Sequence, residues 1–448
     1  MSPLHCNLDI YRIARRRCPI VLAGASSTLS GIVSIALYPG FEMAIKGDDA
    51  LGLAEGLEGL LEDPAFDPAA LDYSTRRRLS EAARKLSLAT EAPGDTVHRI
   101  AHTPFQLPLA LIGVETGLFD VLADLKGANA TNAELAAKTS VEPALLRRLL
   151  RYYQSFGIVS QPGDDQYAAN NITRALVSPG GRSALPFILS AIAPAINAMP
   201  EFLRDTKYAD AMTDPARLPW HLGHEGTAAP IFRWIHERPE VLGCFAGWMA
   251  GQRDGLPDFL SAVDFEAEFA GGAAPPGGAP VFVDVGGSMG HQCVAVRRRY
   301  PHLAGRIVLQ DLPATIERVR TDPLPGFDGI EAQAHDFLTP QPLFGARAYY
   351  LRNVLHDWPD DRCVDILRNI APAMAADSRI LVDEMILPER DAPWRAAQQD
   401  LIMGACIAAR ERTRGEWLAL FDRAGLRVER MWRYTEELSD HLIVLVPK

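Results

Sequence analysis

Cysteine is scarce in this chain and is never paired along the sequence. The 448 residues include six cysteines, namely Cys6, Cys18, Cys244, Cys293, Cys363 and Cys406. None forms a Cys-x-x-Cys spacing, so the sequence indicates neither a cysteine zinc site nor a disulfide framework. Unpaired thiols are typical of a reducing compartment, and we expect a cytoplasmic protein.

The chain is also short of positive charge. It has 45 Lys and Arg against 56 Asp and Glu, a formal net charge of −11. Affinity for nucleic-acid backbones comes mainly from clustered Lys and Arg, so we expect no nucleic-acid partner. The apolar fraction of 48% and the charged fraction of 23% are those of an ordinary globular protein, and the length allows two domains.

Long uninterrupted hydrophobic runs are missing. The nearest to one is CPIVLAGASSTLSGIVSIALYPG, which follows Arg15, Arg16 and Arg17. Basic residues before an apolar stretch can mark a signal or a membrane anchor. Because Ser, Thr and Gly dilute this stretch, we expect residues 1–47 to be a poorly ordered extension and predict no membrane partner.

Residues 48–250 carry mostly helical patterns. Leucines recur at helical spacing from Asp48 to about Leu88, and residues 103–122 predict a long apolar helix. Thr131 and Glu134 predict a capping box, Pro143 the start of a second helix, and Gly157 its end. Two strand-like runs then flank Pro-Gly-Asp-Asp, which indicates a hairpin.

Helix, helix and hairpin in this order predict a winged helix. Such modules often bind DNA, and Arg147, Arg148 and Arg151 form a modest basic cluster. In an acidic chain, a dimerisation module is the better interpretation, and we expect a homodimer.

Residues 251–448 alternate strands with helices. A short Gly- and Pro-rich stretch at 270–280 predicts a loop. The following strand candidates are VFVDVG, RIVLQDL, EAQAHDF, AYYLRNVL, RILVDEMIL, LRVERMWRY and HLIVLVP. This alternation predicts an α/β fold, a Rossmann-like doubly wound sheet that is largely parallel and covered on both faces.

The first strand candidate leads into a glycine-rich turn. Gly286 and Gly287 allow a close backbone approach to a ligand at a helix N-terminus. The Gly-x-Gly-x-x-Gly fingerprint of NAD-binding proteins fails here, because Ser288 and His291 stand at its third and sixth positions.

Acidic residues follow the next two strands. Asp311 ends one strand, where a carboxylate can accept from both hydroxyls of a ribose. Asp336 and Phe337 end another, where they could contact an adenine, although Asp336 could equally be a turn residue. Because the carboxyl ends of parallel strands meet at one edge, these residues together predict a nucleoside site.

The run AYYLRNVLHDWPDDR places His356 where a buried strand gives way to a helix. A histidine there is a candidate general base near neutral pH, or a buried structural residue. Pro359 is expected at the first helical position, followed by Asp360 and Asp361 in the first turn.

These motifs follow one another in the order of a known family. VDVGG, Asp311-Leu-Pro, Asp336-Phe337, LHDW, EMILP and RERT resemble the S-adenosylmethionine-dependent O-methyltransferases that act on small phenols, including plant caffeate and flavonoid enzymes and their fungal secondary-metabolite relatives. The resemblance runs from about residue 95 to the C-terminus and includes the winged helix, which is a dimerisation domain in that family. Ser288 departs from the family's third glycine, and the first 45 residues match nothing in it.

The resemblance implies roles for particular residues. His356 would be the catalytic base, flanked by Glu384 and Glu411, and Arg352 would be a cofactor contact. From the sequence alone, Glu411 could be a surface capping residue, Glu384 a solvated strand end, and Arg352 half of an ion pair. Residues expected near the acceptor are Phe245, Trp248, Met249, Met403 and Ile407, which could also be core.

The function predicted is methyl transfer from S-adenosylmethionine to a phenolic hydroxyl of an aromatic secondary metabolite, such as a polyketide. The reaction would be a direct displacement with His356 as base, and no metal site is predicted. The alternatives are a catalytically silent relative that binds cofactor or DNA, and an NAD-dependent oxidoreductase.

Overall fold

The computed structural model describes residues 47–63, 65–271 and 275–448. Nearly all of the predicted N-terminal extension and part of the predicted loop at 270–280 lie outside these residues. The chain divides between His98 and Arg99 into two compact units.

The described part of the first unit consists of helices. They are α1 (Gly47–Glu62), a short 3-10 turn (Pro68–Ala70), α2 (Tyr73–Thr90) and the start of α3 (Pro93–His102). The predicted helical pattern is confirmed, but Asp63 and Pro68 interrupt it. Asp72 begins α2 by accepting a hydrogen bond from the main-chain N–H of Thr75 at 3.0 Å.

The second unit begins with the predicted winged helix. Its elements are α4 (Gln106–Glu115), α5 (Leu118–Asp124), α6 (Asn132–Thr139), α7 (Pro143–Ser155), β1 (Val159–Gly163), β2 (Gln166–Ala169) and α8 (Asn171–Leu176). The capping box of Thr131 and Glu134 and the antiparallel hairpin are confirmed. The single long helix expected over 103–122 is wrong, because Gly117 adopts a positive φ of 69° and separates α4 from α5.

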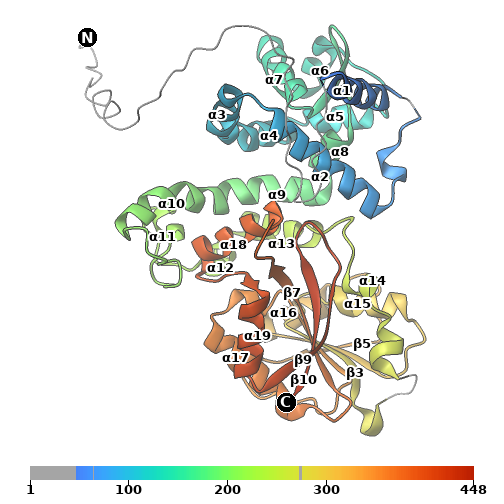
Figure 1. The fold of residues 1–448 in the computed structure, drawn as a ribbon, viewed down its shortest axis with the longest axis vertical. Coiled ribbons are helices and arrows are strands. Elements are labelled where there is room, and N and C mark those ends of the chain that lie inside the picture. The colour runs from blue at the N-terminus through green and yellow to red at the C-terminus, as the bar shows by residue number, and fades with distance from the viewer. Residues whose placement is uncertain (1–46, 64, 272–274) are drawn as a thin grey trace. The chain divides into compact units, whose positions relative to one another are not determined.

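A long helical segment follows, and Figure 1 shows its two parts in line. It runs through α9 (Pro179–Phe187), a π-helical turn (Ile188–Ile192) and α10 (Ala193–Asp205). The next helices are α11 (Pro219–Gly223), α12 (Ile231–His236), α13 (Pro239–Gly251) and α14 (Phe259–Ala262). The described segment Pro179–Asp205 is long and apolar enough to cross a membrane, and residues 93–124 would pass that test as a bent pair. Such helices also occur inside soluble proteins, so the absence of a membrane partner stays a prediction.

The sheet of the second unit confirms the predicted Rossmann-like α/β fold. Its strands are β3 (Pro280–Val285), β4 (Arg306–Asp311), β5 (Ile330–Ala334), β6 (Ala348–Arg352), β7 (Arg379–Leu387), β8 (Arg412–Thr413), β9 (Leu426–Arg433) and β10 (Asp440–Pro447). The order is β5-β4-β3-β6-β7-β10-β9, with β8 beside β7. Strand β10 runs in the direction opposite to the other strands of the sheet. The carboxyl ends of β3, β4, β5 and β6 therefore meet at one edge.

Helices cover both faces of this sheet (Figure 1). Helices α17 (Asp360–Ile370) and α19 (Arg414–Arg423) pack on one face, and α14, α15 (His291–Arg299) and α16 (Pro313–Thr321) pack on the other. Successive side chains of β3 supply the two cores, since Val283 and Val285 point to the first and Phe282 to the second. Helix α18 (Trp394–Ile407) contacts α10 and α11 and shares a third core with them.

The predicted boundary between residues 250 and 251 stays a prediction, because the winged helix and the sheet belong to the same compact unit. Pro359 is the N-cap of α17 instead of its first residue, a displacement by one position.

The core under α19 generates a test of stability. Phe421 is 1% exposed and stacks on Trp417 with ring centroids 5.4 Å apart. We expect Phe421→Ala to lower the free energy of unfolding by about 3–5 kcal/mol, because it leaves a cavity in a packed core. The matched control is Phe344→Ala at a side chain that is 67% exposed, where a change below about 0.5 kcal/mol is expected. Urea denaturation measures both, and equal losses would contradict this description of the core.

Candidate active site

His356 lies on a short turn at the carboxyl end of β6. The strand ends at Arg352, and Asn353 then adopts a positive φ of 49°, which turns the chain into the 3-10 turn Leu355–Asp357. The whole of His356 is only 8% exposed. A buried imidazole at this edge needs polar partners, since an unpaired buried polar group is costly.

The side chain of Glu384 holds the turn by accepting hydrogen bonds from the main-chain N–H groups of the turn. This glutamate lies within β7 and is fully buried, so the alternative of a solvated strand end is excluded. Its Oε1 accepts hydrogen bonds from the N–H groups of Val354 (3.0 Å), Leu355 (2.8 Å) and His356 (3.3 Å). Burial, partly opposed by the charge of His356, raises the pKa of Glu384 to about 7.

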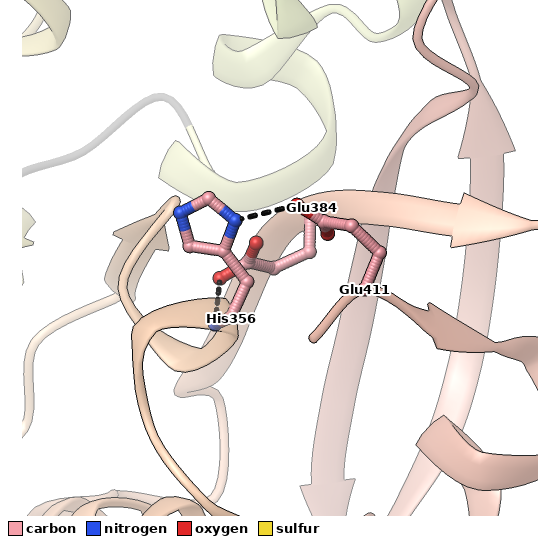
Figure 2. Close-up of side chains that lie close together, drawn as sticks. All are labelled: His356, Glu384 and Glu411. Carbon is pink, nitrogen blue, oxygen red and sulfur yellow. Dashed lines mark hydrogen bonds and ion pairs between the residues drawn. The ribbon is translucent and has the colours of Figure 1, made fainter. Parts of the chain in front are cut away.

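Glu411 holds the ring. It precedes β8 and is 3% exposed, so it is not a surface capping residue. Its Oε1 is 2.8 Å from Nδ1 of His356, and its own N–H donates to Oδ1 of Asp400 at 2.9 Å. Figure 2 shows the imidazole facing Glu411 while the carboxylate of Glu384 meets the main-chain nitrogen of His356. The structure thus brings together the three residues predicted to be catalytic.

The hydrogen bond to Glu411 fixes the orientation of the imidazole. Nδ1 donates to this carboxylate, which leaves Nε2 as the ring nitrogen that can gain or lose a proton. Asp357 lies on the other side, with its Oδ1 3.4 Å from Nε2. Burial by itself lowers the pKa of His356, but the charges of Glu411, Asp357 and Glu384 outweigh it and raise this pKa to about 10.

Arg412 is a positioning residue that sequence reasoning missed. Its side chain is fully buried and donates to the carbonyl oxygens of Leu355 (3.1 Å) and Trp358 (2.7 Å). It also pairs with Oδ1 of Asp360 at 2.9 Å. Arg412 therefore ties β8 to the turn that carries His356. It stands among several arginines in the run RERTR, so no sequence signal set it apart.

A pocket of about 500 Å³ opens beside this turn. Four of the residues predicted to contact a cofactor line it, namely Gly286, Asp311, Asp336 and Phe337. The pocket reaches the turn at Val354, Asp357 and Trp358, directly beside His356. The predicted nucleoside residues and the predicted base are therefore neighbours at one sheet edge.

The glycine-rich turn is shaped by close packing. Gly286 has a φ of 74°, and a Cβ there would lie 3.1 Å from Val354 and 3.3 Å from the ring of Phe337. A Cβ on Gly287 would lie 2.4 Å from the carboxyl carbon of Asp284, so this glycine is needed for packing although it does not line the pocket. Side chains at both positions would distort the turn.

Asp311 faces the same turn. Its Oδ2 accepts from the N–H of Ser288 at 2.9 Å, and its Oδ1 accepts from the N–H of Leu312 at 2.8 Å. A carboxylate has about four acceptor positions, so both oxygens can still accept from a ligand's hydroxyls. Oδ1 of Asp336 accepts from the N–H of Leu338 at 2.9 Å, as expected of a turn residue that also lines a pocket.

Arg352 does not line the pocket. Its NH1 lies 3.9 Å from Oδ2 of Asp383, a carboxylate on β7, and its expected contact with the cofactor stays a prediction. Of the five residues expected near the acceptor, Ile407 lines the pocket. Met403 is buried, Phe245 and Trp248 pack beside the core of α9–α13, and Met249 is 41% exposed.

Residues that sequence reasoning did not predict also line the pocket. They are Pro215, Leu218, His221, Pro230, Ile231, Phe232, Leu312, His335, Leu338, Asn353, Val354, Asp357, Trp358 and Cys406. Those on or next to α11 and α12 were missed because apolar residues in a helical stretch can equally form a protein core or line a ligand pocket.

His356, Glu384 and Glu411 also satisfy the distance requirement of a metal site. One ligand atom from each lies within 4.8 Å of the others. Nδ1 of His356 and Oε1 of Glu384 are already hydrogen-bonded, whereas the Oε2 atoms of both glutamates have no partner among the described residues. No spacing in the sequence marks these three residues as a metal site, and the absence of a metal stays a prediction.

Comparisons with known proteins agree on one family. A family model for the O-methyltransferase domain matches residues 277–427, and one for the O-methyltransferase dimerisation domain matches residues 111–179. The chain is 38% identical over 374 residues to the O-methyltransferase ucdC of Aspergillus ustus, covering 83% of this chain and 94% of that protein.

Solved structures show the same similarity. The chain resembles LepI in complex with S-adenosylmethionine, with a TM-score of 0.80, 32% identity, and coverage of 90% of this chain and 100% of that one. It also resembles a pericyclic reaction enzyme, with a TM-score of 0.79, 33% identity, and coverage of 89% and 100%.

The pair of His356 and Glu411 should make stability depend on pH. Because the folded-state pKa of His356 is about 10, above the ordinary value of about 6.5, this group stabilises the fold fully below pH 6.5 and progressively less as the pH rises to 10. Glu411→Gln keeps a hydrogen-bond acceptor but removes the charge. We expect its free energy of unfolding to fall less than that of the wild type between about pH 7 and pH 10.

Denaturation at several pH values measures this difference. The control is Glu317→Gln at an exposed position, which should keep the wild-type profile. Parallel profiles for wild type and Glu411→Gln would show that Glu411 does not raise the pKa of His356.

Proposed function

The chain belongs to the family of S-adenosylmethionine-dependent O-methyltransferases of fungal secondary metabolism, and from this premise we propose that it methylates a phenolic hydroxyl of an aromatic metabolite with His356 as general base. The observation that carries the proposal is the imidazole oriented by Glu411 beside a pocket lined by Gly286 and Asp311. An aromatic polyketide is the proposed class of acceptor, and a homodimer the proposed assembly.

The residues of the sheet edge fit the cofactor. Gly286 leaves room that a Cβ would fill, and the carboxylate of Asp311 can accept from ribose hydroxyls. Asp336 and Phe337 are proposed to hold the adenine. When bound, S-adenosylmethionine supplies an electrophilic methyl group and leaves as S-adenosylhomocysteine.

The chain's own part in catalysis is to orient the acceptor and move its proton. A phenol has a pKa near 10, so its oxygen is a weak nucleophile until the proton is removed. Nε2 of His356 would take that proton, so that the phenolic oxygen could act as the nucleophile toward the methyl group that S-adenosylmethionine would supply. Glu411 stabilises the imidazolium that results.

The high pKa of His356 has two consequences for this role. Because its pKa is raised, the imidazole is a stronger base than an ordinary histidine. It is also largely protonated at neutral pH in the free protein. A positive charge close to the ring would disfavour its protonated form, so a bound cation near His356 would lower the pKa of this group.

A change of His356 tests the base. We expect His356→Ala to lower kcat by about 100-fold or more, because general-base catalysis contributes roughly 100- to 10,000-fold. The affinity for S-adenosylmethionine, measured by calorimetry, should stay within several-fold. A parallel loss of cofactor affinity would show that His356 is structural.

The assay supplies a panel of phenolic polyketides, anthraquinones and phenylpropanoids and detects products by mass spectrometry. A product heavier by one methylene group marks methyl transfer, whereas a product of unchanged mass would indicate a different reaction, and one similar solved structure is that of a pericyclic reaction enzyme. Activity should persist in a chelator, and its loss there would instead assign a metal to the His356 cluster.

A change of Asp311 tests the cofactor site separately. We expect Asp311→Ala to weaken binding of S-adenosylmethionine by about 10-fold or more, since hydrogen bonds to a charged group contribute about 1.5–3 kcal/mol. The matched control is Asp328→Ala, an acidic residue outside this pocket. An unchanged affinity in Asp311→Ala would remove this residue from the cofactor site.

A further inference from the structure

The two sides of the pocket differ in chemistry. The strand side carries the three carboxylates of the pocket, Asp311, Asp336 and Asp357. It also contributes His335, Asn353 and the apolar residues Leu312, Phe337, Leu338, Val354 and Trp358. The opposite side comes from α11, α12, α18 and the segments next to them, and it is almost entirely apolar. Its residues are Pro215, Leu218, Pro230, Ile231, Phe232 and Ile407. Apart from the weakly polar thiol of Cys406, His221 is the polar exception among the described residues of this side.

The hydrogen bonding of His221 fixes where its proton lies. Nδ1 accepts from the main-chain N–H of Leu218 at 3.0 Å, at the start of α11. An imidazole nitrogen that accepts cannot carry the proton of the neutral ring, so the proton is on Nε2. Burial lowers the pKa of His221 and favours this neutral form. No hydrogen bond to Nε2 occurs among the described residues.

Helix α11 is closely packed, and the hydrogen bond from Leu218 restricts the rotation of the His221 ring. Trp220 donates from its indole nitrogen to the carbonyl oxygen of Ala229 at 3.0 Å and stacks on His224 with ring centroids 3.7 Å apart. A Cβ on Gly223 would lie 2.3 Å from the carbonyl oxygen of Pro194, so α11 packs closely on α10. A donor in an apolar wall can select among ligands, because a partner without an acceptor atom leaves it unpaired.

We infer that Nε2–H of His221 donates a hydrogen bond to an uncharged carbonyl oxygen of the methyl acceptor. The inference rests on the proposed function and narrows its substrate class to flat phenols that also carry a ketone or quinone oxygen. An anionic group is disfavoured, since three carboxylates line the other side of the pocket. His221 is thus a specificity-determining residue, separate from the base.

Two nearly isosteric substitutions isolate the donor. Glutamate and glutamine at this third helical position can both accept the Leu218 N–H, so His221→Glu and His221→Gln keep the hydrogen bond that begins α11. The glutamine side chain can also donate, and the glutamate side chain cannot.

The probes are two tricyclic phenols of the same shape. Hydroxyfluorenone carries a ketone, and hydroxyfluorene has a methylene group in its place. Their dissociation constants are measured by calorimetry on the full chain saturated with S-adenosylhomocysteine, so the readout needs no turnover. The affinity of each variant for S-adenosylhomocysteine reports whether it has folded.

We expect the wild type to bind the ketone about 3- to 10-fold more tightly than the methylene analogue, as one hydrogen bond allows. His221→Gln should keep part of this preference, and His221→Glu should abolish or reverse it. The inference is wrong if the wild type shows no preference, or if His221→Glu keeps it. If the preference behaves as expected but no phenol is methylated, the proposed function fails while the role of His221 stands.

Discussion

The turn at the end of β6 depends on one buried carboxyl group. A single carboxylate oxygen of Glu384 receives three successive main-chain N–H groups from Val354, Leu355 and His356. Donors at a sharp turn have no strand partner, and without this oxygen they would be buried unpaired. The placement of the imidazole, the entry into α17 and the wall of the pocket at Asp357 all follow from this anchoring.

The surrounding charges form a balanced set. His356 lies among Glu411, Asp357 and Glu384. Arg412 donates hydrogen bonds to carbonyl oxygens of the same turn. Acidic groups near a base raise its proton affinity, and a cation in the pocket opposes them. The cluster can therefore respond to the charge of whatever occupies the pocket, which a neutral surrounding could not do.

Much of this was predictable, for identifiable reasons. Buried strands flanked by glycine and acidic residues gave the parallel sheet, and the order of the strand ends placed Gly286, Asp311 and Phe337 in one pocket. Arg412 escaped prediction, because an arginine's role depends on which carboxylate or carbonyl the fold brings near it, and the cofactor contact expected of Arg352 stays a prediction. The break at Gly117 was hidden inside an apolar run, and the tautomer of His221 depends on a local hydrogen bond that no spacing reveals.

The separate origin of the two pocket walls has an evolutionary consequence. The acidic wall comes from strand ends whose main chains are committed to the sheet, so replacements there disturb the folding of the whole unit. The apolar wall comes from short helices and the segments between them, where side chains can be exchanged at little cost to the sheet. Gene duplicates of such a chain can diversify in what they accept while inheriting the donor chemistry unchanged.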